Sequence, residues 1–351
     1  MQAIIVPEPG PPENMCLGQR HLPVCDEQNT LLVQVAYTAL NRADTLQRQG
    51  LYPPPPDASD ILGLELSGIV CEVGPGAEAS RFKRGDRVMS LVTGGAYAVY
   101  CLVDAATTMA IPDSLPLRLA ASIPEAWLTA YQLLHFVGNF QPGDKVLIHA
   151  GASSVGLAAI QLVREMGGVP MATASTKKQH LLHKMGVAPQ HAIDYTNNPY
   201  PSLESAVEAA TEGGGVDLVL CCVGAPYFGQ NLQALAKGGR LVLYGLMGGS
   251  LVPSPLDLRV LMKKMLQVTA TTLRGRPREY KARLVERFWT EERRQKFVAG
   301  IKNGREKGES FETNVCRTFP WGDAALAHAM MERNENAGKI VLAVTPSLDE
   351  R

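Results

Sequence analysis

The sequence predicts an α/β fold in which a doubly wound parallel sheet is joined to a second, mainly β domain. From about residue 122, short apolar runs alternate with segments of helical spacing, and this alternation is typical of β-α-β units. Before residue 122, short apolar runs are separated by proline- and glycine-rich turns. This second pattern indicates strands with few helices, as in a distorted barrel.

The first part of the chain contains four expected strands. Stiff turns such as Gly74-Pro75-Gly76 separate them, because proline and glycine interrupt regular strand pairing. The strands cover residues 2–6, 31–37, 66–73 and 87–91.

The second part repeats one unit, a buried strand followed by a helix. It opens with a helix over residues 126–137 and a turn at residues 141–144. Helices of this length between strands are expected to cover both faces of a parallel sheet. A further helix from Trp321 through Met331 and a strand over residues 339–344 follow later. The repeated elements are expected, in chain order, at residues 145–149, 155–166, 169–174, 177–185, 191–194, 202–211, 216–223, 227–235 and 240–244.

The composition is that of a globular protein and excludes several classes. Lys+Arg and Asp+Glu both number 34, so no net field favours nucleic acid or an anionic membrane. No secretory signal is visible at residues 1–12, and no run of about 20 apolar residues is present to span a bilayer. The seven cysteines are scattered, without a C-x-x-C pair, which favours a reducing, cytoplasmic setting. The pair Cys221–Cys222 ends a run typical of a buried strand, which favours a core role over a redox role.

The strongest functional signal is the stretch from Val146 to Leu162. An apolar strand leads through small residues directly into a helix. Small residues let the backbone approach a pyrophosphate, and the N–H groups and dipole of the helix start favour its negative charge. Only Gly151 and Gly156 of the motif are glycine, so a tight structural turn is the alternative. The β-α-β context favours a dinucleotide site.

The residues after the next strand bear on which dinucleotide is bound. An NAD enzyme usually has an acid there, which accepts from the ribose 2′-hydroxyl. Here Ala174 is followed by Ser175-Thr176-Lys177-Lys178, without an acid. Hydroxyls and lysines suit a 2′-phosphate, so the sequence favours NADPH over NADH. An ordinary helix start with exposed lysines is compatible with the same role.

A basic stretch from Arg274 to Lys307 allows a second interpretation. Arginines and lysines there stand among glutamates, and such a run can contact RNA. However, Leu284, Val285 and Phe288 recur at helical spacing, which favours a solvated amphipathic helix. RNA binding is therefore an alternative that the pattern does not favour.

Four separated motifs resemble one known family. They resemble segments of the zeta-crystallin-like quinone oxidoreductases, within the medium-chain dehydrogenase/reductase superfamily, and the resemblance covers nearly the whole chain. It implies a discontinuous GroES-like barrel domain made of residues 1–122 and 274–351, with a Rossmann domain that binds NADPH over residues 123–273. The motifs are Ala39 to Pro53, Ile61 to Glu65, Pro124 to Tyr131 and Leu243 to Gly249.

The same resemblance implies roles for single residues. Asn41 and Tyr52 would lie near the nicotinamide as the catalytic residues. Tyr52 would steer the acceptor or donate a hydrogen bond to its oxygen, or alternatively pack the cofactor. Thr129 would approach the cofactor from the linking helix. Further NADPH contacts would be Ser154 and Val155 at the pyrophosphate, Ser175, Lys178 and Tyr195 at the 2′-phosphate, Tyr244, Gly245, Leu246 and Met247 beside the nicotinamide, and Leu273 and Asn336 closing over the cofactor. Members of the family form dimers, so a homodimer or homotetramer is expected, with residues 240–246 as a plausible sheet edge for the contact.

No metal site is expected. Zinc alcohol dehydrogenases of the same superfamily carry Cys and His ligands near the first strands and a lobe with four close cysteines. Here Asn41-Arg42-Ala43-Asp44 and Gly63-Leu64-Glu65 occupy the first region, with leucine where a zinc relative would have histidine. No ligand set with tetrahedral spacing is evident. Glu65 is expected to be a buried hydrogen-bonding group rather than a base.

The absence of metal ligands narrows the expected chemistry. A quinone or a conjugated enone accepts hydride readily without a Lewis acid, because its own π system delocalises the charge. The expected reaction is zinc-independent, NADPH-dependent reduction of quinones, by hydride or single-electron transfer. Reduction of α,β-unsaturated carbonyls (enals and enones) is the alternative. A structural or RNA-binding protein that retains NADPH affinity with little turnover is an alternative of another class.

Overall fold

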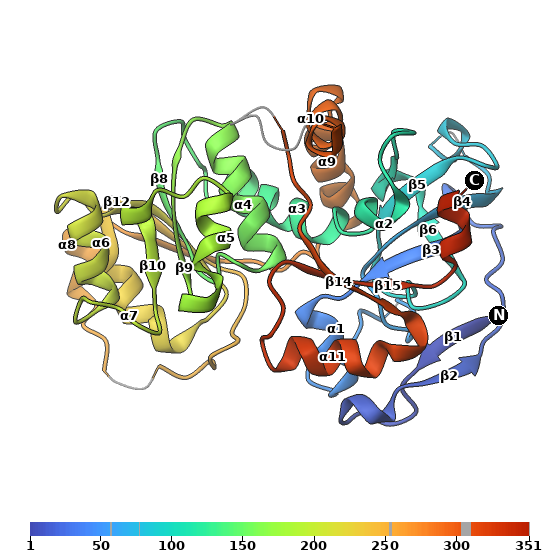
Figure 1. Cartoon of the computed structure of the whole chain (residues 1–351), viewed down its shortest axis with the longest axis horizontal. Helices are drawn as coiled ribbons and strands as arrows, with labels where there is room; N and C mark the ends of the chain where they lie inside the picture. Colours follow the sequence, from blue (N-terminus) through green and yellow to red (C-terminus); the bar gives the residue numbers. More distant parts are fainter. Residues whose placement is uncertain (57, 77, 253–254, 303–309, 351) are drawn as a thin grey trace. The chain divides into compact units, whose positions relative to one another are not determined.

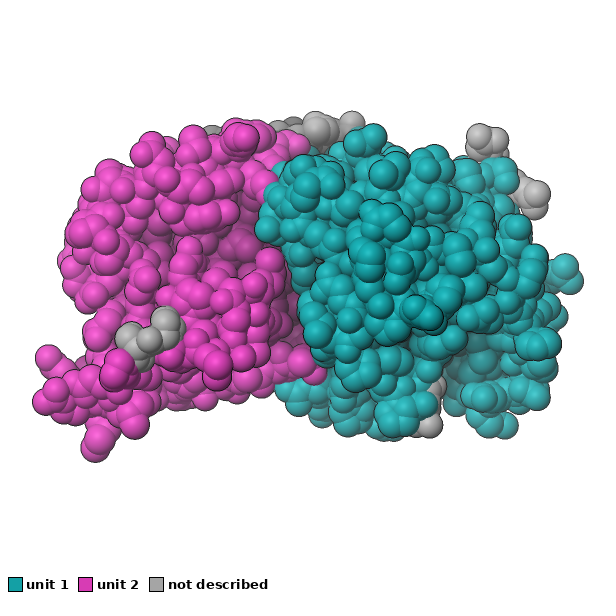
Figure 2. Space-filling model, turned by 90° about the horizontal axis from the view of Figure 1, so that it is seen from below, with its two compact units in different colours: residues 1–128, 274–351 teal, residues 129–273 magenta. Residues whose placement is uncertain are grey.

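A computed structural model describes residues 1–56, 58–76, 78–252, 255–302 and 310–350 of the chain. The chain forms two compact units, coloured teal and magenta in Figure 2. Unit 1 comprises Met1–Leu128 and Arg274–Arg351, and unit 2 comprises Thr129–Leu273.

The first division falls inside helix α3 (Pro124–Tyr131), whereas the sequence places a boundary before this helix, after residue 122. Aromatic packing explains the difference. The ring of Trp127 lies 4.7 Å from that of Phe297 and 4.8 Å from that of Phe311, centroid to centroid, and all three belong to unit 1. The first residues of α3 therefore share the core of unit 1.

Unit 2 is built on a six-stranded sheet in which neighbouring strands are parallel (Figure 1). The strand order is β10-β9-β8-β11-β12-β13, so the chain winds outward in both directions from β8 and β11. This confirms the predicted doubly wound sheet. The strands are β8 (Lys145–Ile148), β9 (Val169–Ala174), β10 (Ala192–Asp194), β11 (Val216–Cys221), β12 (Leu235–Leu243) and β13 (Gln267–Ala270), and the helices among them are α4 (Ser154–Glu165), α5 (Gln179–Lys184), α6 (Leu203–Thr211), α7 (Ala225–Ala234) and α8 (Arg259–Lys264).

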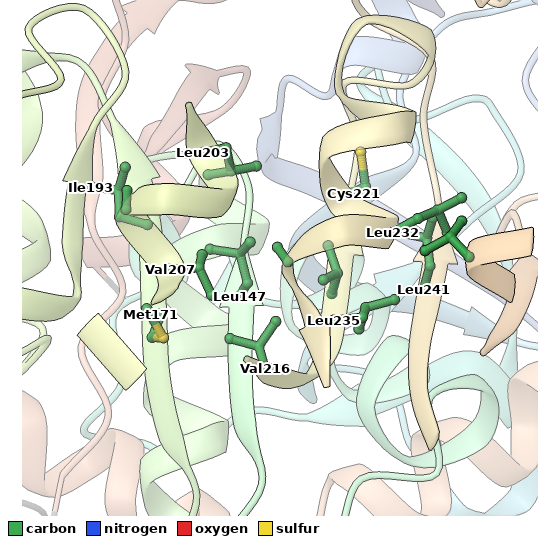
Figure 3. Close-up of a cluster of buried hydrophobic side chains, with 14 residues drawn as sticks. Leu147, Met171, Ile193, Leu203, Val207, Val216, Cys221, Leu232, Leu235 and Leu241 are labelled. Carbon is green, nitrogen blue, oxygen red and sulfur yellow. The ribbon is translucent and has the colours of Figure 1, made fainter. Parts of the chain in front are cut away.

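One face of this sheet packs on α6, α7 and α8 through the core shown in Figure 3. Leu147 and Leu241 of the sheet meet Val207 of α6 and Leu232 of α7, and all four are fully buried. Successive side chains of a strand point to opposite faces, so the neighbours of Leu147 in β8 face the other side, where α4 and α5 pack. Cys221 lies in the same core, in agreement with the predicted core role.

The edge strands of this sheet are β10 and β13, so the prediction that residues 240–246 form an edge was wrong. β12 pairs with β11 on one side and with β13 on the other, from Arg240 opposite Gln267 to Leu243 opposite Ala270. The sequence analysis missed β13 because its four residues follow the charged end of α8 and lack an apolar run. Val268 of this edge strand is 42% exposed.

Unit 1 is mainly β, and its larger sheet combines both ends of the chain. The order is β14-β15-β3-β4-β5-β7, with β6 also pairing on β3. β14 and β15 pair in parallel, and the other described pairs of this sheet are antiparallel. Strand β15 therefore completes a sheet begun more than 300 residues earlier, since Val341 pairs with Ala39. The strands are β3 (Thr30–Ala39), β4 (Glu65–Val73), β5 (Arg87–Leu91), β6 (Tyr100–Asp104), β7 (Thr108–Ala110), β14 (Val315–Pro320) and β15 (Lys339–Ala343), and β1 (Gln2–Ile5) forms a separate antiparallel pair with β2 (Cys16–Gln19).

Helices of unit 1 pack beside these strands. They include α1 (Arg42–Arg48), α2 (Leu117–Ala120), α9 (Arg278–Phe288), α10 (Glu291–Lys302) and α11 (Ala324–Glu332). Within the described ranges, no helix combines the length and apolar character that crossing a membrane requires.

The basic stretch forms two helices, α9 and α10, rather than one, and its last residues, 303–307, lie outside the described residues. Leu284 and Phe288 of α9 are fully buried, which confirms an amphipathic helix there. Arg278 pairs with both Glu78 and Asp104. These ion pairs engage part of the positive charge that an RNA contact would need.

Candidate functional site

The parallel sheet of unit 2 brings the predicted cofactor residues of this unit to one edge. Carboxyl ends of parallel strands meet at the same edge, and ligands of open α/β sheets bind there, where the strand order reverses. The reversal lies between β8 and β11. Ser154 and Val155 follow β8, Ser175 and Lys178 follow β9, Tyr195 follows β10, Tyr244, Gly245, Leu246 and Met247 follow β12, and Leu273 follows β13.

The turn between β8 and α4 has the properties of an anion-binding loop. Ala150 adopts a left-handed conformation (φ 51°), and Ser153 caps the helix by accepting from the N–H of Gly156 at 3.1 Å. The N–H groups of Ser154 and Val155 precede the first i→i−4 bond of α4, so the helix offers them no partner. These two donors and the positive end of the helix dipole suit a phosphate.

Gly156 sets how closely α4 approaches this loop. A Cβ on Gly156 would lie 2.5 Å from the carbonyl oxygen of Ala150 and 2.6 Å from that of Gly151, closer than real side chains come. Gly151 is similarly restricted, because its Cβ would lie 2.7 Å from the Cβ of Ala172. The two glycines therefore serve close packing, while Ser153 serves as the cap.

The ends of β9 and β10 place the three residues predicted for the 2′-phosphate in one neighbourhood. The N–H of Lys178 donates to the carbonyl of Ser175 at 2.8 Å, and that of Tyr195 donates to the carbonyl of Ala174 at 3.2 Å. Ser175 and Lys178 are half-buried, and Tyr195 is 53% exposed. The backbone positions of Ser175, Lys178 and Tyr195 thus lie close together, at the ends of two adjacent strands.

An acid that the sequence analysis did not consider, Asp194 at the end of β10, lies beside this group. One carboxylate oxygen accepts from the hydroxyl of Thr176, and the other accepts from the N–H and hydroxyl of Thr196 at 2.9 and 2.7 Å. Both oxygens are engaged within the turn. Asp194 therefore differs from the acid of NAD enzymes, which follows the second strand and binds the ribose.

His149, directly before the turn, is a buried hydrogen-bonding residue. Its Nδ1 lies 3.2 Å from the hydroxyl of Thr173 and its Nε2 lies 2.7 Å from Oδ1 of Asn231. Burial lowers the pKa of His149 to about 4, so the ring is neutral at pH 7. The ring also contacts that of Tyr227, at 4.9 Å between centroids.

In unit 1, Asn41 stands in a buried polar cluster. Its Nδ2 donates to Oε1 of Glu65 at 2.9 Å, and its Oδ1 accepts from Nζ of Lys339 at 2.8 Å. Lys339 also pairs with Oε1 of Glu65 at 2.6 Å, with the two side chains 2% and 0% exposed. The N–H of Glu125 donates to the other Glu65 oxygen at 2.9 Å. Glu65 is thus the predicted hydrogen-bonding group, and it fixes the orientation of the Asn41 amide.

Asp44 adds a second carboxyl to this cluster. Its side chain accepts from the N–H of Asn41 at 2.8 Å, which completes a capping box at the start of α1, and from the N–H of Gly63 at 3.0 Å. Burial raises the pKa of Asp44 to about 6, although both N–H donors oppose the shift. Burial also raises the pKa of Glu125 to about 8, and the Glu65 carboxylate acts in the same direction. Glu125 is therefore mainly protonated at pH 7.

Tyr52 and Asn336 belong to unit 1, and Thr129 belongs to unit 2. Tyr52 is half-buried, and the guanidinium of Arg274 lies 5.5 Å from its ring centroid. Asn336 donates to the carbonyl of Gly338 within its own turn, at 3.0 Å. Thr129 is half-buried on α3, and Leu273 is buried.

The loop after β12 combines a half-buried tyrosine with exposed apolar side chains. Burial raises the pKa of Tyr244 well above its usual range, so this hydroxyl stays protonated. Leu246 and Met247 are both more than half exposed. Exposed apolar residues at the ligand-binding edge of the sheet are suited to contact a flat ring.

Comparisons with known proteins identify the family. A family model described as "Alcohol dehydrogenase GroES-like domain" matches residues 27–113, and one described as "Zinc-binding dehydrogenase" matches residues 154–290. A probable quinone oxidoreductase from Schizosaccharomyces pombe is 30% identical over 322 residues, which cover 91% of this chain and 90% of that protein. The chain belongs to the quinone oxidoreductase family. This places it in the medium-chain dehydrogenase/reductase superfamily and confirms the GroES-like and Rossmann-type fold class.

Two further proteins match this chain over different shares of their own length. The structure of Escherichia coli quinone oxidoreductase complexed with NADPH has a TM-score of 0.81 and 26% identity, and the match covers 98% of this chain and 100% of that chain. The pikromycin polyketide synthase component PikAII of Streptomyces venezuelae is 35% identical over 213 residues. That match covers 61% of this chain but 5% of the synthase, so the chain corresponds to a small part of that protein.

The name of one matching family model, "Zinc-binding dehydrogenase", raises the question whether this chain has side chains that could bind zinc. Asn41 and the buried Leu64 stand where the resemblance led us to look for zinc ligands, and neither side chain is a Cys, His, Asp or Glu. Across the part of the chain that the structure describes, no group of three or more His, Cys, Asp or Glu side chains is arranged to hold a metal ion.

Sequence reasoning missed two residues of the unit 1 site, Lys339 and Arg274. Lys339 was noticed only as the first residue of an apolar strand, and Arg274 only as the start of the basic stretch. A lysine in a strand that is otherwise fully apolar is the signal for a buried ion pair. The Asn41-x-x-Asp44 spacing is likewise the signal for the capping box.

Proposed function

We propose that this chain catalyses zinc-independent reduction of quinones with NADPH as the electron donor. The observation that carries the proposal is the turn between β8 and α4, where two helix-start N–H groups and the close approach allowed by Gly156 suit a pyrophosphate. The S. pombe relative bears the name of the same activity, and the E. coli neighbour holds NADPH. When bound, NADPH supplies a hydride to the acceptor.

We propose the following cofactor contacts in unit 2. Ser154 and Val155 donate to the pyrophosphate, and Lys178, with Ser175 and Tyr195, binds the 2′-phosphate. Thr129, Tyr244, Gly245, Leu246, Met247 and Leu273 are proposed as the remaining contacts of this unit.

From unit 1 we propose Asn41, Tyr52 and Asn336 as contact residues. The amide of Asn41 is oriented by Lys339 and Glu65, so it offers a fixed polar surface to the nicotinamide end of the cofactor. Tyr52 presents its ring beside the Arg274 guanidinium, where it would align a flat acceptor. A quinone delocalises incoming charge by itself. The main task of the protein is therefore to position the quinone against the nicotinamide.

Steady-state oxidation of NADPH with a panel of acceptors tests the proposed function. The purified chain should oxidise NADPH in the presence of ortho- or para-quinones and should form hydroquinones. Turnover of enals or enones with none of the quinones would replace the proposal by the enone reductase alternative. Saturable NADPH binding without turnover of either class would favour the binding-protein alternative.

Replacing Lys178 with alanine is expected to weaken NADPH binding about tenfold or more and to leave NADH binding nearly unchanged. Only NADPH carries the 2′-phosphate, and one charged hydrogen bond contributes roughly 1.5–3 kcal/mol. Dissociation constants for both cofactors, measured by calorimetry, provide the comparison. Lys177→Ala is the control, because Lys177 is exposed in the same short helix. An equal loss for both cofactors would reject the assignment of Lys178.

We also propose a homodimer, formed through the β13 edge of the unit 2 sheet. An edge strand leaves N–H and C=O groups for pairing, and apolar side chains are exposed on and beside α8, namely Leu258, Met262, Met265 and Val268. Sedimentation of the purified chain at monomer mass would contradict this.

We propose a cytoplasmic setting for this chain. The seven cysteines are free, which supports this setting.

A further inference from the structure

Arg274 is a buried cation with two unpartnered donor groups. The residue is 5% exposed, and its Nε donates to the carbonyl of Thr93 at 2.8 Å. Its Nη1 and Nη2 are buried and have no hydrogen-bond partner among the described residues. Nearly all buried polar groups in proteins have a partner, and a buried charge without one is costly. The fold of unit 1 therefore leaves these donors unexplained.

Contacts around Arg274 hold it in place. Its backbone carbonyl accepts from Nζ of Lys281 at 2.7 Å, and Lys281 is itself buried. The guanidinium carbon lies 5.5 Å from the centroid of the Tyr52 ring, within the range of a cation–π interaction. The Nε–H bond to the Thr93 carbonyl and the contact with the Tyr52 ring fix the orientation of the guanidinium.

Acidic groups lie near Arg274, but none of the described ones accepts a hydrogen bond from its free donors. Burial lowers the pKa of the guanidinium, whereas Asp44, Tyr52 and Glu125 raise it. Asp44 uses its two oxygens to accept from backbone N–H groups. Arg48, another buried arginine, also has two unpartnered donors, Nε and Nη1, but it differs because its Nη2 pairs directly with the carboxylate of Glu332. The Asp44 carboxyl acts on the charge of Arg274 through space, but no described carboxylate accepts a hydrogen bond from Nη1 or Nη2 of Arg274.

We infer that Arg274 donates from Nη1 and Nη2 to the acceptor oxygen that becomes negative during reduction. The inference rests on the proposed function. A hydride brings two electrons and one proton to the quinone, which becomes the hydroquinone monoanion, while NADPH becomes NADP⁺. A proton from water then gives the neutral hydroquinone. Donors fixed in advance where charge develops stabilise the transition state, because they need no reorganisation. Arg274 is thus a catalytic residue, next to the ring of Tyr52.

Kinetics of Arg274→Met test this role. The variant should lose at least tenfold in kcat/KM for the quinone, which corresponds to about 1.4 kcal/mol. Its dissociation constant for NADPH should stay within about twofold of that of the unmodified chain. Arg274→Lys keeps the charge and should recover part of the loss. Arg283→Met, which removes an exposed arginine from α9, is the control and should retain full activity.

A spectroscopic titration provides a second readout without turnover. 4-Nitrophenol resembles the hydroquinone monoanion, and its absorption separates the neutral from the anionic form. Binding to the NADP⁺-loaded chain should lower the apparent pKa of this phenol, and Arg274→Met should abolish the shift while Arg283→Met retains it. Unchanged kcat/KM in Arg274→Met, or an unshifted phenol on the unmodified chain, would overturn the inference.

Two other results separate this inference from the proposed function. If Arg274→Met weakened NADPH binding as much as it slowed turnover, Arg274 would serve the cofactor and the inference would be wrong. If the unmodified chain reduced no quinone, the proposed function would fail. The phenol titration would then still decide whether Arg274 binds an aromatic oxyanion. Should Arg274→Met not fold, Arg274→Lys and the titration of the unmodified chain give the same decision.

Discussion

Lys339→Met is expected to lower the free energy of unfolding by about 3–5 kcal/mol, because it leaves the Glu65 carboxylate buried without its cation. The same change removes the donor to Oδ1 of Asn41. The free energy of unfolding of an ordinary domain is about 5–15 kcal/mol, so the substitution would remove a large share of it. The midpoint of denaturant unfolding, compared with that of the unmodified chain, measures the loss.

A double variant separates the lost charge pair from a general loss of packing. Glu65→Gln combined with Lys339→Met removes both charges and keeps an acceptor for Asn41, so it should be more stable than Lys339→Met alone. Arg333→Met breaks the exposed pair with Glu335 and should cost no more than about 1 kcal/mol. A double variant no more stable than the single one would show that the ion pair is not the cause.

Gly156→Ala is expected to abolish tight NADPH binding. The added methyl group would meet the carbonyl oxygens of Ala150 and Gly151, so the start of α4 must move away from the loop. The N–H groups of Ser154 and Val155 would then no longer point toward the pyrophosphate. Two charge-assisted hydrogen bonds contribute about 3 kcal/mol or more, so the dissociation constant should rise about a hundredfold or more. Calorimetric titration with NADPH measures it.

Gly229→Ala is the matched control for this variant. Gly229 lies inside α7 of the same unit, and its added Cβ would meet only the side chain of Leu256, at 3.8 Å. Alanine favours the helix by about 1 kcal/mol over glycine, so this variant should be at least as stable as the unmodified chain and bind NADPH equally. Normal NADPH affinity in Gly156→Ala would contradict the proposed pyrophosphate contact.

Local sequence patterns predicted unit 2 well. The expected strand over residues 169–174 is β9, and the expected helix over residues 155–166 is α4 within one residue at each end. Both signals are periodic and lie within one short segment. The helix expected over residues 177–185 is instead a short 3-10 turn, Thr176–Lys178, followed by α5, because the chain bends after Ser175.

Long-range contacts account for most of what the sequence did not reveal. Lys339 contacts Asn41 across almost 300 residues, and Arg274 contacts Thr93 across 181. No local pattern encodes such pairings, because burial of a lysine or arginine depends on which strands become neighbours. Asp194 was missed for a related reason: its strand, β10, lies beside β9 only after the sheet has formed. The resemblance to the family named Asn41 and Tyr52, but not the charges that surround them.

Titration of the unmodified chain with NADPH is the most direct test, since the proposed function depends on a dinucleotide binding to the N–H groups at the start of α4. We expect saturable heat of binding with one site per chain, and tighter binding of NADPH than of NADH. No heat and no shift in melting temperature with either dinucleotide would contradict the claim.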